Sequence, residues 1–256
     1  MRVSSNLDRF LLMLALAVLP AFAADVKDVH RTFPLSANGQ LTIDTYKGFI
    51  KVTTWDRAEV DIQARIESDD SMLQDARDIQ DTEIRFDASS NSVRVKTDYS
   101  RIHQWFRFNT SLPRVRYTIS MPRTAELRIK DYKSEADVSG LRSRLDIHTY
   151  KGSVRVRDFD GSIQAYTYKG DMKIEMAGIR DRSKLDTYRG DYELTLPRNA
   201  RFDLEGDNGR RGTIDSDFPR TVRSSRDYRE FRGQINGGGP VLLLKSYRGT
   251  FRLRAR

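Results

Sequence analysis

A four-residue motif recurs six times along the chain and constrains its fold more than any other feature. The motif is a small polar residue, a Tyr, a Lys or Arg, and a Gly, as in Thr149 to Gly152. Its tyrosines are Tyr46, Tyr132, Tyr150, Tyr168, Tyr188 and Tyr247. The basic residues that follow them are Lys47, Lys133, Lys151, Lys169, Arg189 and Arg248. Ser134 replaces the Gly in one copy, and Asp131 replaces the small polar residue there.

Apolar residues keep fixed offsets from each Tyr. They stand three positions before it and four and six positions after it, as Ile147, Val154 and Val156 do around Tyr150. This alternation with period two predicts a strand with one buried face on each side of the motif. The Gly is expected where the backbone needs a positive φ or a tight bend.

The spacing of the copies predicts how these strands assemble. The middle copies are roughly 18 to 20 residues apart, a length that with strand periodicity favours an all-β, β-solenoid or β-helix-like stack. Each coil would be two short strands joined at the Tyr, with coils about 4.8 Å apart. The apolar and Thr rows would then point inward, and the Tyr and Lys/Arg rows outward.

Two weaker copies extend the pattern. Ser89 takes the place of the Tyr between Phe86 and Val93, and Asn208 takes it in the segment after Tyr188. The apolar residues before Asn208 are out of step by one position. Because a slip of one residue exchanges the buried and exposed faces, we expect a register break there.

The N-terminus has the form of a secretory signal peptide. Arg2 and Arg9 precede an apolar segment over 10–20, and Ala21 to Ala23 forms an A-x-A cleavage site. We predict cleavage after Ala23, and the alternative is an uncleaved N-terminal anchor. Residues 24–256 would form one β domain, with an irregular part over 24–122, regular coils over 123–196 and looser coils over 197–256. No transmembrane span is expected after cleavage.

The irregular part contains three recognisable segments. Val60 to Ile66 and Val115 to Met121 alternate as strands, and residues 69–80 fit one short helix that would cover an end of the stack. Between them, residues 99–112 form a long loop with Trp105, Phe106 and Phe108. A loop of this kind either is functional or packs on the body of the protein.

No recognisable catalytic motif is present. His30, His103 and His148 do not form a repeated row, and the pairs Asp158/Asp160 and Asp215/Asp217 lack the spacing of calcium-binding β-rolls, so turn capping is the simpler role for these acids. We therefore expect no catalytic residues, no metal and no cofactor. Some β-helices act on polysaccharides, which leaves an enzyme of the cell envelope as the alternative.

The composition indicates the kind of partner. The chain has no Cys and a net charge of +9, spread along its length. Such a mixed basic balance favours anionic surfaces and gives no reason to expect nucleic acid. The expected partners are an anionic envelope polymer or another envelope protein.

The outward Tyr and Lys/Arg rows are the candidate binding site. They would offer cations to acidic groups and aromatic rings to sugars along an extended polymer. The simpler alternative is structural, because Tyr side chains on neighbouring strands stabilise a sheet without any ligand.

Three features together resemble the family of exported bacterial proteins of unknown function labelled "putative adhesin". They are the exported N-terminus, the strand Val115 to Pro122 that leads into Leu127 to Ile129 and the coils, and the stretch Asn236 to Gly249. The resemblance implies a β-solenoid-like domain at the cell envelope, in the periplasm or at the cell surface. It implies adhesin-like binding or scaffolding, and it supplies no catalytic residues.

Overall fold

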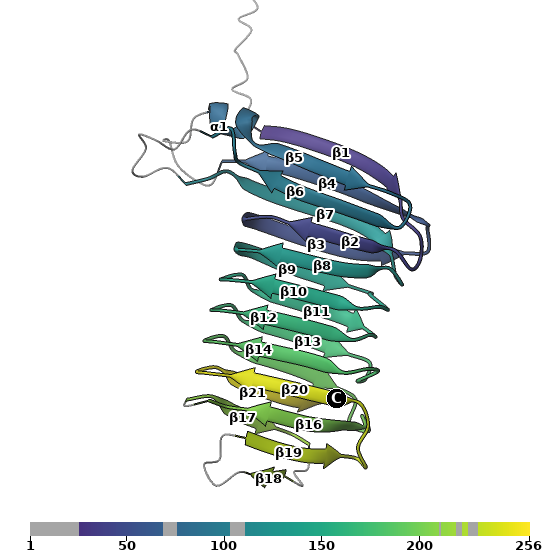
Figure 1. Cartoon of the computed structure of the whole chain (residues 1–256), viewed down its shortest axis with the longest axis vertical. Helices are drawn as coiled ribbons and strands as arrows, with labels where there is room; N and C mark the ends of the chain where they lie inside the picture. Colours follow the sequence, from purple (N-terminus) through teal and green to yellow (C-terminus); the bar gives the residue numbers. More distant parts are fainter. Residues whose placement is uncertain (1–25, 69–75, 103–110, 210, 219–221, 225–229) are drawn as a thin grey trace, which may run out of the picture.

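The protein is a long stack of strands in two facing sheets (Figure 1). The computed structural model describes residues 26–68, 76–102, 111–209, 211–218, 222–224 and 230–256. The predicted all-β, β-solenoid-like fold with one short helix is confirmed. The predicted signal peptide, residues 1–23, lies outside the described residues. No helix in the described ranges is long and apolar enough to cross a membrane.

Within these ranges the first sheet has ten strands and the second has eleven. In spatial order the first sheet contains β1 (Val26–Pro34), β4 (Glu59–Glu67), β7 (Arg114–Pro122), β3 (Lys47–Trp55), β9 (Lys133–Ser139), β11 (Val154–Phe159), β13 (Met172–Met176), β15 (Tyr192–Leu196), β21 (Thr250–Ala255) and β17 (Thr213–Ser216). The second contains β18 (Val222–Ser224), β19 (Glu230–Ile235), β16 (Phe202–Asp207), β20 (Val241–Ser246), β14 (Ser183–Thr187), β12 (Ile163–Thr167), β10 (Leu145–Thr149), β8 (Glu126–Asp131), β2 (Gln40–Asp44), β6 (Ser92–Asp98) and β5 (Glu83–Ala88).

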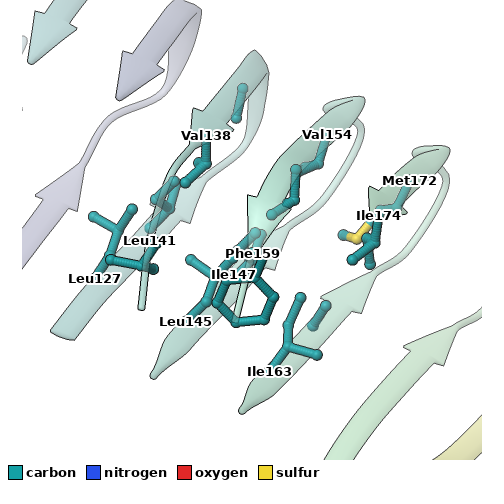
Figure 2. Packing of buried hydrophobic residues seen from close by; sticks show 14 of the residues in the cluster. Leu127, Val138, Leu141, Leu145, Ile147, Val154, Phe159, Ile163, Met172 and Ile174 are labelled. Carbon is teal, nitrogen blue, oxygen red and sulfur yellow. The ribbon is translucent and has the colours of Figure 1, made fainter. Parts of the chain in front are cut away.

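The predicted apolar rows pair residue for residue. Ile147 lies opposite Ile129 on one side and Ala165 on the other, in parallel strands of the second sheet. Val154 likewise lies between Ala136 and Met172 in the first sheet. These rows point into one continuous core between the sheets. Figure 2 shows Leu127, Leu145 and Ile163 following one another in the second sheet, with Val138, Val154 and Met172 in the first.

The order of coils in space differs from their order in the chain at both ends. Strand β2 lies between β6 and β8, and β3 lies between β7 and β9. Strand β20 lies between β14 and β16, and β21 lies between β15 and β17, so the last coil of the chain is inserted into the stack (Figure 1). Insertion preserves the core because every coil presents the same inward rows.

The weak copy at Ser89 is a wrong prediction. Strands β5 and β6 form an antiparallel hairpin, and the backbone N–H of Ser89 donates to the carbonyl of Ser92 at 2.7 Å. A hairpin has period two on both arms, as a coil corner has, so the pattern could not separate them. Val95 instead lies opposite Ile43, which puts Thr97 beside Thr45.

The register break near Asn208 is confirmed, although the residue opposite Tyr247 is Gly209. Strand β16 pairs Asp207 with Lys245, and this pairing brings Gly209 level with Tyr247. Ile214 then lies opposite Phe251, one position later than the other coils require. The offset in register therefore increases by one residue between β16 and β17.

Gly206 leaves a gap in the core that another strand fills. It lies opposite Leu244 in the inward row and opposite Phe231 of β19. A Cβ added to Gly206 would be 1.8 Å from the ring of Phe231, which is only 8% exposed. The aromatic ring therefore substitutes for the missing aliphatic side chain.

The predicted helix is present as α1 (Ala76–Asp81), at the end of the stack near β1 and β5 (Figure 1). Ile79 is buried in the core, and the Lys27 ammonium donates to the carbonyls of Gln80 and Thr82 at 2.8 and 2.9 Å. The helix thus covers this end as expected. The predicted strands Val60 to Ile66 and Val115 to Met121 are β4 and β7.

Candidate functional site

A hydrogen bond inside five of the six motifs sets the turn that presents the Tyr. The buried hydroxyl of Thr167 accepts from the backbone N–H of Gly170 at 2.8 Å. The same bond forms from Gly152 to Thr149, from Gly190 to Thr187 and from Gly249 to Ser246. In the variant copy the carboxylate of Asp131 accepts from the N–H of Ser134 at 2.7 Å. In these five copies the residue before the Tyr therefore serves as a short hydrogen-bond acceptor, whereas the hydroxyl of Thr45 in the remaining copy bonds that of Thr97.

The motif glycines follow tight bends, as one of the two predicted roles requires, but the other predicted role, a positive φ, does not hold for most of them. Only Gly48 among the motif glycines has a positive φ, of 138°. A Cβ at Gly170 would lie 1.7 Å from the carbonyl oxygen of Gly152 in the neighbouring coil, and one at Gly190 would lie 1.8 Å from that of Gly170. Gly is required because adjacent turns approach each other too closely for a side chain.

The six motif tyrosines form one continuous column, which we call the tyrosine stack. Neighbouring ring centroids are 4.7 to 4.8 Å apart, and the ring planes are within 2 to 10° of parallel. In spatial order the stack is Tyr46, Tyr132, Tyr150, Tyr168, Tyr188 and Tyr247. The structure therefore brings together all six tyrosines that the sequence singled out.

Stacking determines which part of each ring meets solvent. The interior rings have both faces against neighbours, so they present their edges outward. A sugar cannot lie on those faces, and the expectation that the rings meet sugars along the whole row is corrected for this reason.

The two ends of the tyrosine stack differ. At one end Tyr99 meets Tyr46 edge to face, with centroids 6.3 Å apart and planes at 75°. Its hydroxyl donates to the carbonyl of Pro113 at 3.0 Å, and burial raises its pKa well above the ordinary value. At the other end Gly209 stands level with Tyr247, so the next coil supplies no ring there.

The basic residues after each Tyr form a second column, which we call the cation row. The Lys151 ammonium is 5.5 Å from the centroid of Tyr150 and 5.9 Å from that of Tyr132. These nearly equal distances place it beside the stack and not over a ring face. Lys169, Arg189 and Arg248 lie 5.5 to 5.6 Å from the centroids of their own tyrosines. Lys47 donates to the hydroxyl of Ser111.

Most of the cation row has no acidic partner. Lys133, Lys151, Lys169, Arg189 and Arg248 are exposed, and none forms an ion pair in the part of the chain that the structure describes. On the opposite edge, at the turns that follow first-sheet strands, some cations are paired, whereas Arg144, Arg182 and Arg198 form no ion pair among the described residues. Arg142 lies 2.7 Å from Asp158 and Arg180 lies 2.6 Å from Asp160.

Asp131 is a half-buried acid beneath the tyrosine stack, in the row that Thr occupies in the neighbouring coils. Burial raises the pKa of this carboxyl, and the hydrogen bonds from Ser134, Thr149 and Lys133 only partly oppose that effect. An ionised carboxylate in a Thr row is disfavoured because it loses hydration.

The histidines do not form a site. His30 Nε2 lies 2.5 Å from Asp61, whose pKa is lowered because the bonds from His30 and Thr32 outweigh the opposing effect of burial. His148 points outward, and its ring lies 4.7 Å from that of Tyr166. His103 and the predicted aromatic loop residues Trp105, Phe106 and Phe108 lie outside the described residues.

Both acidic pairs that the sequence singled out form ion pairs with arginines. Asp158 and Asp160 bond Arg142 and Arg180, and Asp215 and Asp217 both bond Arg254, at 2.6 and 3.2 Å. The described residues contain no group of three or more His, Asp or Glu side chains that could hold a metal ion.

One hollow contains two carboxylates but not in a hydrolytic arrangement. It measures about 770 Å³ and is lined by Asp203, Glu205, Arg232 and Gln234. The two acids stand two residues apart on β16 and so share one wall. Glycoside hydrolysis instead requires two carboxyls that flank the scissile bond.

Sequence reasoning missed Tyr99 and Gly209, the residues that bound the tyrosine stack. The sequence signal for Tyr99 was Thr97, because Val93, Val95 and Thr97 continue the inward row of β6. The hydroxyl of Thr97 lies 3.0 Å from that of Thr45. No sequence signal pointed to Gly209, since its place depends on which strand pairs with β16.

Comparisons with known proteins identify the family of this chain and a solved structure with the same fold. A crystal structure of a "putative cell adhesion protein" from Clostridium sporogenes matches with a TM-score of 0.51 and 9% identity, over 90% of this chain and 100% of that chain. A "putative adhesin" from Bacteroides fragilis matches with a TM-score of 0.37 and 13% identity, over 89% and 97% of the two chains. No curated protein matches. The family model described as Toastrack DUF4097 matches residues 32–210. The chain therefore belongs to the Toastrack DUF4097 family.

Proposed function

We propose that this protein is a non-catalytic protein of the cell envelope that binds an extended anionic polymer along the tyrosine stack and the cation row. Its binding is adhesin-like, or it scaffolds other envelope components through the same surface. The adhesion-related names of the two similar solved structures support a location outside the cytoplasm. The predicted signal peptide supports export to the periplasm or the cell surface.

The observation that carries the proposal is that five residues of the cation row, Lys133, Lys151, Lys169, Arg189 and Arg248, form no ion pair among the described residues. Like charges one coil apart repel, by about 1 kcal/mol for a pair 4 Å apart in water. Across the described residues, the exposed cations of this row have no carboxylate that offsets this repulsion, whereas Arg142 and Arg180 on the opposite edge do. A polyanion would supply the missing counter-charge.

A structural role explains the tyrosines but not the cations. Cross-strand aromatic pairs contribute roughly 0.2–1 kcal/mol each, so the tyrosine stack stabilises the sheet without any ligand. The residue after the Tyr is exposed in five of the six copies and could be any polar residue for that purpose. Its restriction to Lys or Arg in all six copies therefore favours recognition of anions.

The test is a charge reversal in the cation row. Lys151→Glu combined with Lys169→Glu should weaken binding to polygalacturonate and to inorganic polyphosphate by about tenfold or more, which is at least 1.4 kcal/mol. The melting temperature should hardly change because both side chains are exposed. Binding is measured by calorimetry at fixed salt.

The matched control is Arg155→Glu combined with Lys173→Glu. These exposed residues occupy adjacent first-sheet strands of the same two coils, and their reversal changes the net charge equally. We expect a loss of less than about threefold from the changed net charge alone. Equal losses in the two double variants, or unchanged binding in the first, would remove the cation row as the site.

The compartment has a separate test. The predicted mature protein begins at Ala24 and leaves the cytoplasm. Intact mass and cell fractionation check this, and a cytoplasmic protein that retains residues 1–23 would contradict export.

A further inference from the structure

A small hollow lies at the Tyr247 end of the tyrosine stack. It measures about 220 Å³, and its lining includes Tyr166, Asp186, Tyr188, Asp207, Gly209, Lys245 and Tyr247. Pockets for drug-sized ligands measure about 300–1,000 Å³. This hollow therefore fits one ring and not a larger molecule.

The outer face of Tyr247 is available in this hollow. Its inner face stacks on Tyr188 with centroids 4.8 Å apart and planes within 4°. No other aromatic ring lies on it within the described ranges. A Cβ added to Gly209 would be 3.4 Å from Cδ2 of Tyr247, so the absence of a side chain at Gly209 leaves room beside this ring. Tyr46, at the other end, meets Tyr99 instead.

Polar groups of both signs stand beside this ring face. Asp186 lies opposite Lys245 and Lys245 lies opposite Asp207, so the three form an alternating row across β14, β20 and β16. Asp186 also pairs with Lys184 at 2.9 Å, and Asp207 accepts from the N–H of Gly209 at 2.8 Å. Carboxylates accept hydrogen bonds and an ammonium donates them, so the row matches a ligand that carries several hydroxyl groups.

We propose that the hollow binds a single pyranose ring at the end of an acidic polysaccharide. The C–H face of the sugar lies on the outer face of Tyr247, where the negative aromatic face attracts its slightly positive hydrogens. The sugar hydroxyls donate to Asp186 and Asp207 and accept from Lys245. This inference rests on the proposed function for the rest of the polymer, which continues along the cation row.

The experiment compares Tyr247→Ala with Tyr150→Ala in the mature protein. Both variants remove one ring of the tyrosine stack, but Tyr150 has both faces covered by Tyr132 and Tyr168. The probes are a galacturonate oligosaccharide, a cello-oligosaccharide of the same length and inorganic polyphosphate. Calorimetry gives the affinities, and circular dichroism checks the fold.

We expect Tyr247→Ala to weaken binding of both oligosaccharides by about threefold to tenfold, in keeping with the loss of one aromatic contact. Tyr247→Ala should weaken polyphosphate binding less than oligosaccharide binding. Tyr150→Ala should weaken oligosaccharide binding less than Tyr247→Ala does, because both faces of the Tyr150 ring are covered and only its edge meets solvent. Equal effects of the two variants on the oligosaccharides, or an equal loss of polyphosphate binding in Tyr247→Ala, would overturn the sugar subsite.

A second variant tests the same proposal if Tyr247→Ala unfolds. Gly209→Asn places a side chain beside the outer face of Tyr247 and keeps all six rings. Asn tolerates the φ of 51° at this position, and because its Cβ would lie 2.9 Å from the carbonyl oxygen of Ser246, the turn must shift slightly to accept it. This variant should weaken oligosaccharide binding by a similar factor, and unchanged binding in a folded Gly209→Asn variant would contradict the proposal. Charge reversal of Lys151 and Lys169 without effect on polyphosphate would refute the proposed function alone.

Discussion

Tyr247 stacks on Tyr188 with the ring centroids 4.8 Å apart and the planes within 4°, although the whole segment from β16 to β19 lies between them in the chain. At the other end Tyr46 stacks on Tyr132 across the segment from β4 to β7. The tyrosine stack is thus continuous in space and interrupted in sequence. Its continuity depends on the insertion of two coils into the correct places.

Close approach of the turns predicts different outcomes for two glycines. Gly170→Ala should destabilise the protein by at least about 3 kcal/mol, because its Cβ would lie 1.7 Å from the carbonyl oxygen of Gly152. Gly178→Ala has no atom within 4 Å of the new Cβ and should be neutral or stabilising by up to about 1 kcal/mol. Urea unfolding measures both, and similar losses would contradict the proposed role of the motif glycines.

The hydrogen bond within the motif predicts a difference between two substitutions of Thr167. Thr167→Val keeps the shape but removes the acceptor for the N–H of Gly170, which should cost about 1–3 kcal/mol. Thr167→Ser should cost less, since Ser246 makes the same bond in its own coil. Equal stabilities of the Val and Ser variants in urea would show that the bond is not needed.

The raised pKa of Asp131 predicts how stability depends on pH. The Asp131 carboxyl binds its proton more tightly in the folded state than in the unfolded state. Its contribution to the stability of the fold is therefore complete below the ordinary pKa of 3.8 and is lost as pH rises through the pKa of the folded state. Asp131→Asn should therefore gain stability relative to wild type between pH 3 and pH 7. Urea unfolding at both pH values measures this difference.

Asp160 is the matched control because the hydrogen bond from Arg180 lowers the pKa of its carboxyl. The contribution of Asp160 to the stability of the fold is present above the ordinary pKa of an Asp carboxyl and is lost as pH falls through the pKa of the folded state. Asp160→Asn should therefore change in the opposite direction, losing stability relative to wild type as pH rises. The same direction in both variants would contradict the environment described for Asp131.

The gap at Gly206 predicts coupling between two strands. Phe231→Ala should cost about 3–5 kcal/mol because it opens a cavity in the core. Gly206→Leu alone should also destabilise, since the ring of Phe231 occupies the space. The double variant should recover part of the loss, because Leu is the residue that stands opposite at Leu244. Additive losses in a double-mutant cycle would disprove this packing.

The sequence by itself determined the content of each coil. The fixed offsets of Ile147, Val154 and Val156 from Tyr150 recur in all six copies, and the structure pairs each inward row in register. The outward column of tyrosines followed from the same alternation. Such local patterns are reliable because a strand with one buried face must alternate.

Only the tertiary structure decided which coil lies beside which. Coils that share the same rows can pair in any order, so nothing local placed β20 against β14, or distinguished the hairpin at Ser89 from a coil corner. The same non-local pairing set Gly209 beside Tyr247 and Tyr99 beside Tyr46. It also covered the faces of the interior rings, because parallel strands hold equivalent side chains at the spacing of the backbone hydrogen bonds.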